Sequence, residues 1–209
     1  FTDSYEPCTY MAVCKDGKMG ELQKVSFGTK VAELVGDADV KAIAIGTKLY
    51  DASAMDLVIE ADTQIGNGVI TVYSSKCCMI HETEEVLLAE RKQSCGKCTF
   101  CREGLIQLHT MVKEITEGQG KKEFTDMMEE IGEAMTFSTP CTMGQTASDF
   151  AMGSLKYFAG EYEDHIKKKK CANNVCSAFT LIRIFVKDVR NVRMFVRLMP
   201  LRARAAIST

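Results

Sequence analysis

The sequence lacks several features that would each place it in a particular class of protein. It contains no run of about eighteen apolar residues, the length that a transmembrane helix needs. Residues 1–5 have neither the basic flank nor the apolar stretch of a signal peptide. The 26 Lys and Arg residues nearly balance the 28 Asp and Glu residues, and the net charge is −2. We therefore expect no transmembrane segment and no nucleic-acid partner.

Side chains in a catalytic arrangement are also lacking. The sequence offers no Ser/His/Asp or Cys/His set at the spacing of a nucleophilic site. His81 and His109 have no partner at catalytic spacing, and we interpret them as surface or helix-face histidines. The chain is therefore expected to have no catalytic site of its own, although it can still be a component of an enzyme.

Cysteine, by contrast, is abundant, with ten residues in a chain of 209. Most of them are clustered at the spacings of metal ligands, and the chain is too long for a small disulfide-stapled fold. A reducing compartment keeps such thiols free to bind a metal. This pattern favours a cytoplasmic location. Cys8 and Cys14 lie apart from the clusters and are interpreted as structural or free thiols.

The most informative motif is Ser-Cys-Gly-Lys-Cys-Thr-Phe-Cys-Arg-Glu-Gly at residues 94–104. It places Cys95, Cys98 and Cys101 at C-x₂-C-x₂-C spacing, and Cys141 follows forty residues later. Three thiolates of one tight loop can bind three corners of a [4Fe–4S] cluster and leave the fourth corner to a distant ligand. The motif thus predicts one-electron transfer. A zinc ion on the same four thiolates is the alternative, but the paired C-x₂-C layout of zinc ribbons is absent.

The pattern of apolar residues divides the chain into three regions and predicts an α+β fold. Residues 1–82 carry short β-branched runs bounded by glycines, such as 42–46 and 68–73, and a turn into a short helix at 28–35. Residues 83–170 show helical spacing and predict a four-helix domain that holds the cysteine loop at one end. Residues 171–209 form a Cys/His hinge and a basic tail.

The helical region is expected to contain three helices besides the one before the cysteine loop. Apolar residues from 105 to 115 predict one helix, which Gly118 and Gly120 end. Residues 124–135 predict a second, and residues 147–162 a third. The many Met residues on these helices are interpreted as core residues.

The full string around the cysteines, with Thr-Pro-Cys at 139–141, resembles the iron–sulfur region of the flavin- and NADH-binding F subunit of respiratory complex I. Related subunits of NAD-dependent and bifurcating hydrogenases and formate dehydrogenases share it. Residues 27–29, 55–56, 66–72 and 78–80 resemble the soluble-ligand-binding β-grasp (SLBB) domain of the same protein. The resemblance covers roughly residues 24–176. It implies that Cys95, Cys98, Cys101 and Cys141 bind one [4Fe–4S] cluster. The sequence departs from the family at Phe100, where Pro is usual.

The resemblance also implies a function and a set of partners. The upstream flavin and NADH domain of the family has glycine-rich phosphate loops, and this chain has no comparable loop, so we expect no FMN or NAD site here. The chain is then either a fragment or a separate relay subunit of a soluble NAD(P)H- or ferredoxin-linked oxidoreductase. Flavoprotein, thioredoxin-like [2Fe–2S] and hydrogenase-type subunits are the implied partners. The alternative is a binding module, in which the β-grasp domain recognises a ligand or partner and the metal is structural.

Two further patterns lie near the end of the chain. His165, Cys171 and Cys176 resemble a zinc site that follows the cluster domain in the bifurcating-hydrogenase branch of the family, with Cys77, Cys78 or water as the fourth ligand; the alternative is two buried thiols and an exposed histidine. In the tail, apolar residues stand at the C-x₂-C-x₂-C-x₃-C-P positions of a ferredoxin half. The tail is either a ferredoxin half without a cluster or an amphipathic basic segment, and neither binds iron. The apolar residues are Val189, Val192, Phe195 and Met199.

Overall fold

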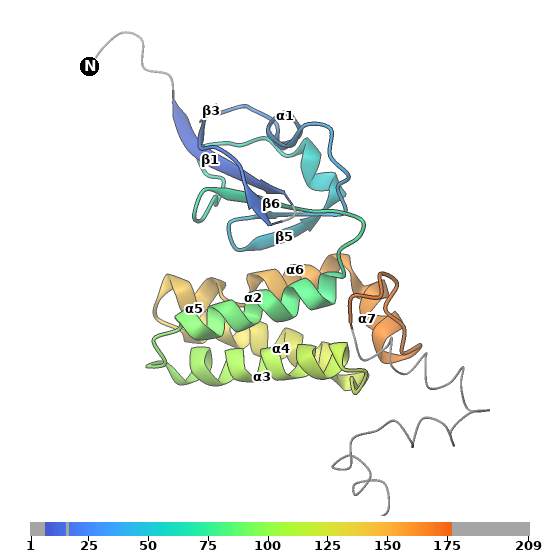
Figure 1. The fold of residues 1–209 in the computed structure, drawn as a ribbon. Coiled ribbons are helices and arrows are strands. Elements are labelled where there is room, and N and C mark those ends of the chain that lie inside the picture. The colour runs from blue at the N-terminus through green and yellow to red at the C-terminus, as the bar shows by residue number, and fades with distance from the viewer. Residues whose placement is uncertain (1–6, 16, 177–209) are drawn as a thin grey trace, which may run out of the picture.

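The computed structural model describes residues 7–15 and 17–176. The two interpretations of the tail concern residues 177–209 and lie outside the described part of the chain. Within the described residues, a mixed sheet occupies the first part of the chain and helices follow it (Figure 1). The expected combination of strands and helices is confirmed. No described helix is both long enough and apolar enough to cross a membrane.

The sheet has the strand order β2-β1-β6-β4-β5; β2 pairs with the last two residues of β1, and β3 pairs with its first four. Its first strand and its last, β1 and β6, are parallel neighbours in the middle, and every other pair is antiparallel. The predicted strands at 42–46 and 68–73 are present as β4 and β6. The strands are β1 (Cys8–Lys15), β2 (Lys18–Met19), β3 (Gln23–Ser26), β4 (Ala42–Ile45), β5 (Lys48–Asp51) and β6 (Val69–Tyr73).

Alternation of side chains in the strands gives the sheet two apolar faces. On one face Ile43 and Ile70 pack with residues of helix α1 (Val31–Val35) and of the 3₁₀ turn η1 (Ala52–Asp56). On the other face Ala42, Ala44 and Leu49 pack against helical residues. β4 is therefore buried on both sides, which explains why it reads as a continuous apolar run.

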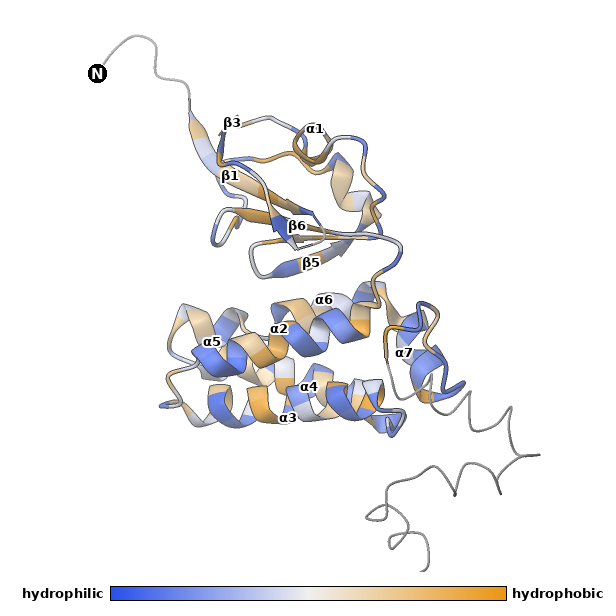
Figure 2. Cartoon of the chain, viewed as in Figure 1, coloured by the Kyte–Doolittle hydropathy of each residue, from blue (hydrophilic) through white to orange (hydrophobic). Residues whose placement is uncertain are grey.

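Four long helices pack in a ring in which α2 contacts α3, α3 contacts α4, α4 contacts α6, and α6 contacts α2. Their inward faces form one core that contains Leu87, Leu105, Leu108 and Met128. In Figure 2 hydrophilic and hydrophobic segments alternate along α2. The helices are α2 (Met79–Gln93), α3 (Thr99–Thr116), α4 (Glu123–Ser138), α5 (Thr142–Thr146), α6 (Asp149–Tyr157) and α7 (Ala159–Ile166).

The helical region differs from the sequence prediction in three places. Helix α2 begins at Met79, ahead of the boundary expected at residue 83. The helix predicted over 147–162 is wrong as one element, because Phe158 leaves helical geometry at φ −120° and ψ 28° and separates α6 from α7. Phe158 packs against the cluster of residues between sheet and helices, and this contact outweighs local helix propensity. The short helix α5 was not predicted.

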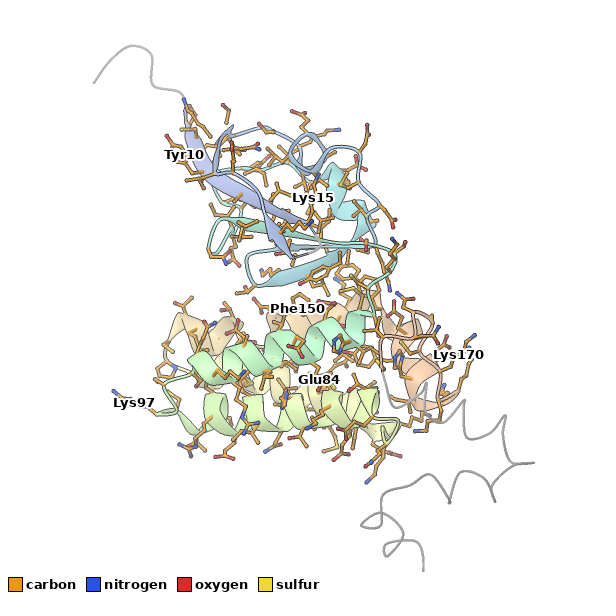
Figure 3. The ribbon with its side chains drawn as sticks, viewed as in Figure 1. Tyr10, Lys15, Glu84, Lys97, Phe150 and Lys170 are labelled. Carbon is orange, nitrogen blue, oxygen red and sulfur yellow. The ribbon has the colours of Figure 1, made fainter. Side chains whose placement is uncertain are left out.

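The sheet rests directly on α2 and α6 (Figure 1). Phe150 and Met79 are buried between the two layers, and Figure 3 shows Phe150 at this boundary. Gly153 makes the close approach between α6 and β5, since a Cβ atom at this position would lie 2.5 Å from the Leu49 carbonyl oxygen. The layers are therefore in van der Waals contact, and the sheet holds the helices that carry the cysteines.

Candidate metal centres

The four cysteines of the predicted cluster line one cavity. Its volume is about 170 Å³, and Gln93, Ser94 and Met143 complete its wall. Cys95 and Cys98 come from the loop between α2 and α3, while Cys101 lies in the first turn of α3. Cys141 comes from the junction of α4 and α5, far along the sequence. The fold thus brings the distant cysteine to the loop, as ligation of one cluster requires.

The backbone of the cysteine loop is fixed by its own polar contacts. Gly96 has φ +69°, a left-handed conformation that glycine adopts without steric conflict. Its amide donates to the Ser94 hydroxyl over 3.3 Å, and the Arg102 Nη1 group donates to its carbonyl oxygen over 2.8 Å. Arg102 also forms an ion pair of 2.8 Å with Glu103. These contacts brace the turn of the backbone that follows Cys95.

The start of α3 provides a favourable electrostatic environment for an anionic group. Cys98 is the N-cap residue of this helix, and Thr99, Phe100 and Cys101 follow it. The first amide groups of a helix have no partner within the helix and carry partial positive charge. They lie beside the cavity. A ligated iron–sulfur cluster is anionic, and hydrogen bonds to its sulfurs tune its potential, so this donor set fits such a group.

The four cysteines differ in how much solvent reaches them around this cavity. Cys95 and Cys141 are exposed, Cys98 is half-buried and Cys101 is buried, so the cavity is open to solvent on one side.

A second group of potential ligands lies on the opposite side of the helical region, where α2 begins. The ligand atoms of Cys78, His165, Cys171 and Cys176 all lie within 4.8 Å of one another, and all four side chains are buried. The Cys78 sulfur is 3.8 Å from the Cys176 sulfur and 3.5 Å from His165 Nε2. The thiol–thiol distance matches the roughly 3.8 Å of a tetrahedral zinc site.

The thiols and the imidazole of this second group shift one another's pKa values. The hydrogen bond from Cys176 lowers the pKa of Cys78 to about 3, against the opposing effect of burial. Burial lowers the pKa of His165, but its contacts with the Cys78 thiolate outweigh this and raise it to about 9. The same hydrogen bond and burial raise the pKa of Cys176. Cys78 is thus the thiol of this pair that loses its proton more readily, and metal binding must displace the protons that the other ligands hold.

Neighbouring polar groups orient these ligands. His165 Nδ1 lies 2.8 Å from the Glu161 carbonyl oxygen, which leaves Nε2 directed at the thiols. The Asn173 amide donates to the carbonyl oxygen of Cys77 over 2.6 Å. Lys41 donates to the same oxygen over 2.6 Å and also forms an ion pair of 2.6 Å with Glu161. The segment that joins the sheet to α2 is therefore bound to α7 and to the loop after it.

The structure distinguishes Cys78 from its neighbour Cys77; the sequence left both as candidates for the fourth ligand of the zinc site. Cys78 is the N-cap residue of α2 and points into the second group, whereas the half-buried Cys77 sulfur lies 3.9 Å from the Ser74 hydroxyl. The interpretation without a metal predicts that His165 is exposed. That prediction is wrong, because His165 is buried. The lack of any regular spacing between Cys78 and His165 explains why no sequence motif could pair them.

Other sequence candidates take no part in either group. Cys8 and Cys14 lie on β1 and are half-buried. The interpretation of His109 as a surface residue is wrong, since it is buried on α3, where burial lowers its pKa. His81 is half-buried on α2.

Comparison with known proteins places the first cavity in a recognised region. Residues 82–165 match the family described as the NADH-ubiquinone oxidoreductase-F iron-sulfur binding region. NADP-reducing hydrogenase subunit HndC of Solidesulfovibrio fructosivorans is 32% identical over 54% of this chain and 23% of its own length. The mitochondrial NADH dehydrogenase (ubiquinone) flavoprotein 1 of Dictyostelium discoideum is 30% identical over 50% of this chain and 22% of its length. The resemblance of the cysteine region to this family is thus confirmed.

A solved structure shares the fold as well. The crystal structure of an NAD⁺-reducing [NiFe]-hydrogenase in the H₂-reduced state superposes with a TM-score of 0.71 at 18% identity. The match covers 79% of this chain, so it includes residues outside the iron–sulfur region, and 31% of the hydrogenase chain. The chain spans a little under a quarter of the length of the two curated relatives named above, and about a third of the structural neighbour.

Proposed function

We propose that this chain is an electron-transfer component of a larger oxidoreductase and that Cys95, Cys98, Cys101 and Cys141 bind one [4Fe–4S] cluster. The observation that carries the proposal is the convergence of these four thiols on one cavity. The match of residues 82–165 to an iron–sulfur binding region supports it independently. When bound, such a cluster accepts and donates one electron at a time.

The protein's own residues hold and adjust this site. The fixed turn at Gly96 presents two thiols, the first turn of α3 adds Cys101, and the ring of helices positions Cys141. Burial of Cys101 shields the inner side of the cavity from water, while exposed Cys95 and Cys141 leave the outer side accessible. Ser94 Oγ lies 3.5 Å from the Cys101 sulfur and is placed to donate a hydrogen bond to a ligating thiolate.

The sheet supports the finer part of the proposal, that residues 1–82 contain an SLBB-like β-grasp domain. In a ubiquitin-like β-grasp the first and last strands are parallel neighbours at the centre, as β1 and β6 are here. Helix α1 covers one face of the sheet. The partners proposed for the chain are flavoprotein, thioredoxin-like [2Fe–2S] or hydrogenase-type subunits. One similar protein is named as part of a hydrogenase and another as a flavoprotein of NADH dehydrogenase, which supports this choice.

For the second group we propose a structural zinc ion bound by Cys78, His165, Cys171 and Cys176. Four buried ligand atoms within 4.8 Å fill a tetrahedral set and leave no position for substrate. These ligands come from the start of α2, from α7 and from the loop after α7. A zinc ion here would connect all three and rigidify the junction with the sheet.

The test is a reductive titration of protein purified without oxygen, combined with metal analysis. The proposal predicts about four iron atoms and four sulfides per chain, a broad visible absorption, and bleaching of that absorption by dithionite. A protein that contains zinc alone and shows no redox response would instead support the binding-module alternative.

A matched pair of variants makes the test specific to the cavity. Cys141→Ser removes the distant ligand and is expected to abolish the stable four-iron form. Cys8→Ser, on β1, removes a cysteine outside both groups and should keep the iron content and the absorption of the unmodified chain. Equal iron content in the two variants would contradict the ligand assignment.

A further inference from the structure

The open side of the first cavity lies at one end of the ring of helices. The loop between α2 and α3 and the junction of α4 with α5 meet at this end (Figure 1). Cys95 and Cys141, one from each segment, are exposed there. A cluster held by these thiols would thus have one edge near the surface. Within the proposed function, electrons would enter or leave through this edge, and a partner must come close to it.

Two exposed phenylalanines flank this opening. Phe137 is 85% exposed in the last turn of α4, shortly before Cys141, and Phe100 is 52% exposed between Cys98 and Cys101. Among the described residues no other large apolar side chain is as exposed as Phe137. Two phenylalanines in water beside a functional opening are unfavourable for an isolated protein and are typical of the centre of a protein interface.

Basic side chains outnumber acidic ones at this end of the helices, where exposed Glu103 and Glu133 also lie. Arg91 and Lys92 lie in the last turn of α2, Lys97 lies in the cysteine loop, and Arg102 lies in the first turns of α3; all are exposed. Figure 3 shows Lys97 extending from this end of the molecule. Arg102 is paired with Glu103, whereas the described part of the chain gives Lys97 no ion-pair partner. A partner with an acidic surface would complement this charge.

We propose that this end of the helices, defined by Phe100, Phe137 and Lys97, is the docking face for a redox protein with an acidic surface around an apolar centre. The inference rests on the proposed function, since it assigns the partner of the same cluster. The phenylalanines supply apolar contact area, and the basic groups orient the partner and speed its approach. Docking there would also exclude water from the exposed edge of the cluster.

The experiment uses the cluster-loaded chain, reduced with dithionite that is then removed, in stopped-flow measurements without oxygen. Oxidised cytochrome b5, a haem protein with an acidic surface, is the protein probe, and an uncharged quinone is the small acceptor. One electron leaves the reduced cluster and converts ferric haem to ferrous haem. Phe137→Ser is expected to slow the second-order reaction with cytochrome b5 about fivefold or more. Its reaction with the quinone is expected to be unchanged.

Charge reversal tests the second part of the docking face. Lys97→Glu is expected to slow the reaction with cytochrome b5 about threefold at low ionic strength, and the difference should disappear at high salt. Two control variants lie away from the opening, near the start of α4. Met127→Ser replaces an exposed apolar residue of this helix, and Lys122→Glu reverses the charge of the exposed residue that precedes it. Both are expected to react like the unmodified chain with either acceptor.

Four results would overturn the proposal. Unchanged rates of Phe137→Ser and Lys97→Glu with cytochrome b5 would show that this face does not receive such a partner. Equal slowing with the quinone would show damage to the cluster instead of lost docking. A dimer at assay concentration that Phe137→Ser dissociates would assign the face to a second copy of the chain. An unmodified chain that cannot reduce the quinone would refute the proposed function itself, and the docking face with it.

Discussion

The neighbouring cysteines 77 and 78 show how strongly one position along the backbone determines the chemistry of a side chain. The Cys78 sulfur is buried beside His165 and Cys176, and its pKa is lowered to about 3. The Cys77 sulfur is half-buried near Ser74. A difference of one residue at the start of α2 directs the two thiols to different environments.

This contrast gives a prediction for the proposed zinc site. Cys78→Ala is expected to weaken zinc binding about 100-fold or more, because loss of a direct ligand exceeds the 10–100-fold effect of losing an outer partner. Cys77→Ala should keep zinc, because the contacts of Cys77 with Lys41 and Asn173 are made by its backbone carbonyl oxygen, which alanine retains. Competition with a chelator that reports free zinc measures both affinities. Similar affinities for the two variants would show that Cys78 is not a ligand.

Among the helices, α2 carries a carboxyl group in an unusual position. Glu90 lines a cavity between sheet and helices together with Tyr73 and Phe150. Burial raises the pKa of Glu90 above its usual value. The folded protein therefore holds this proton more tightly than the unfolded chain does. Stability associated with Glu90 is present at low pH and decreases as the pH rises through its folded pKa.

Glu90→Gln is thus expected to stabilise the protein relative to the unmodified chain at pH 7.5, and the difference should shrink toward pH 4. Glu85→Gln makes the same change at an exposed residue of the same helix and is the matched control. Urea unfolding at several pH values measures the free energy of unfolding of each variant. A constant difference between Glu90→Gln and the unmodified chain at all pH values would contradict this account.

Local patterns predicted most elements of the fold. The helical spacing of apolar residues in α3 and the β-branched runs of β4 and β6 were sufficient to locate those elements. The break at Phe158 could not be predicted, because it depends on packing against the sheet. The same limit applies to the metal groups. The spacing within the cysteine loop is local and was recognised, whereas the choice of Cys78 depends on residues far along the chain.

The contact of the sheet with the helices determines how residues 7–15 and 17–176 are arranged. The Gly153 position has no room for a side chain, because a Cβ atom would lie 2.5 Å from the Leu49 carbonyl oxygen of β5. A Cβ atom added at Gly160, on α7, would have none of the neighbouring atoms considered within 4 Å. The two glycines therefore differ in packing although both lie in helices.

Gly153→Ala is expected to lower the free energy of unfolding by about 1–3 kcal/mol, because an added carbon forces the sheet away from α6. Gly160→Ala should be neutral or slightly stabilising, since alanine has a higher helix propensity. Chemical unfolding followed by circular dichroism measures both. Equal stability of the two variants would mean that the layers are less closely packed than described.

The central claim is that the two groups of ligands hold two different metals. X-ray diffraction from one crystal, with anomalous differences recorded on each side of the iron and zinc absorption edges, tests it most directly. The account predicts iron density in the cavity of Cys95, Cys98, Cys101 and Cys141, with the extent of a cluster and not of one atom. Zinc density is predicted among Cys78, His165, Cys171 and Cys176. A single zinc atom in the first cavity, with no iron there, would contradict the account.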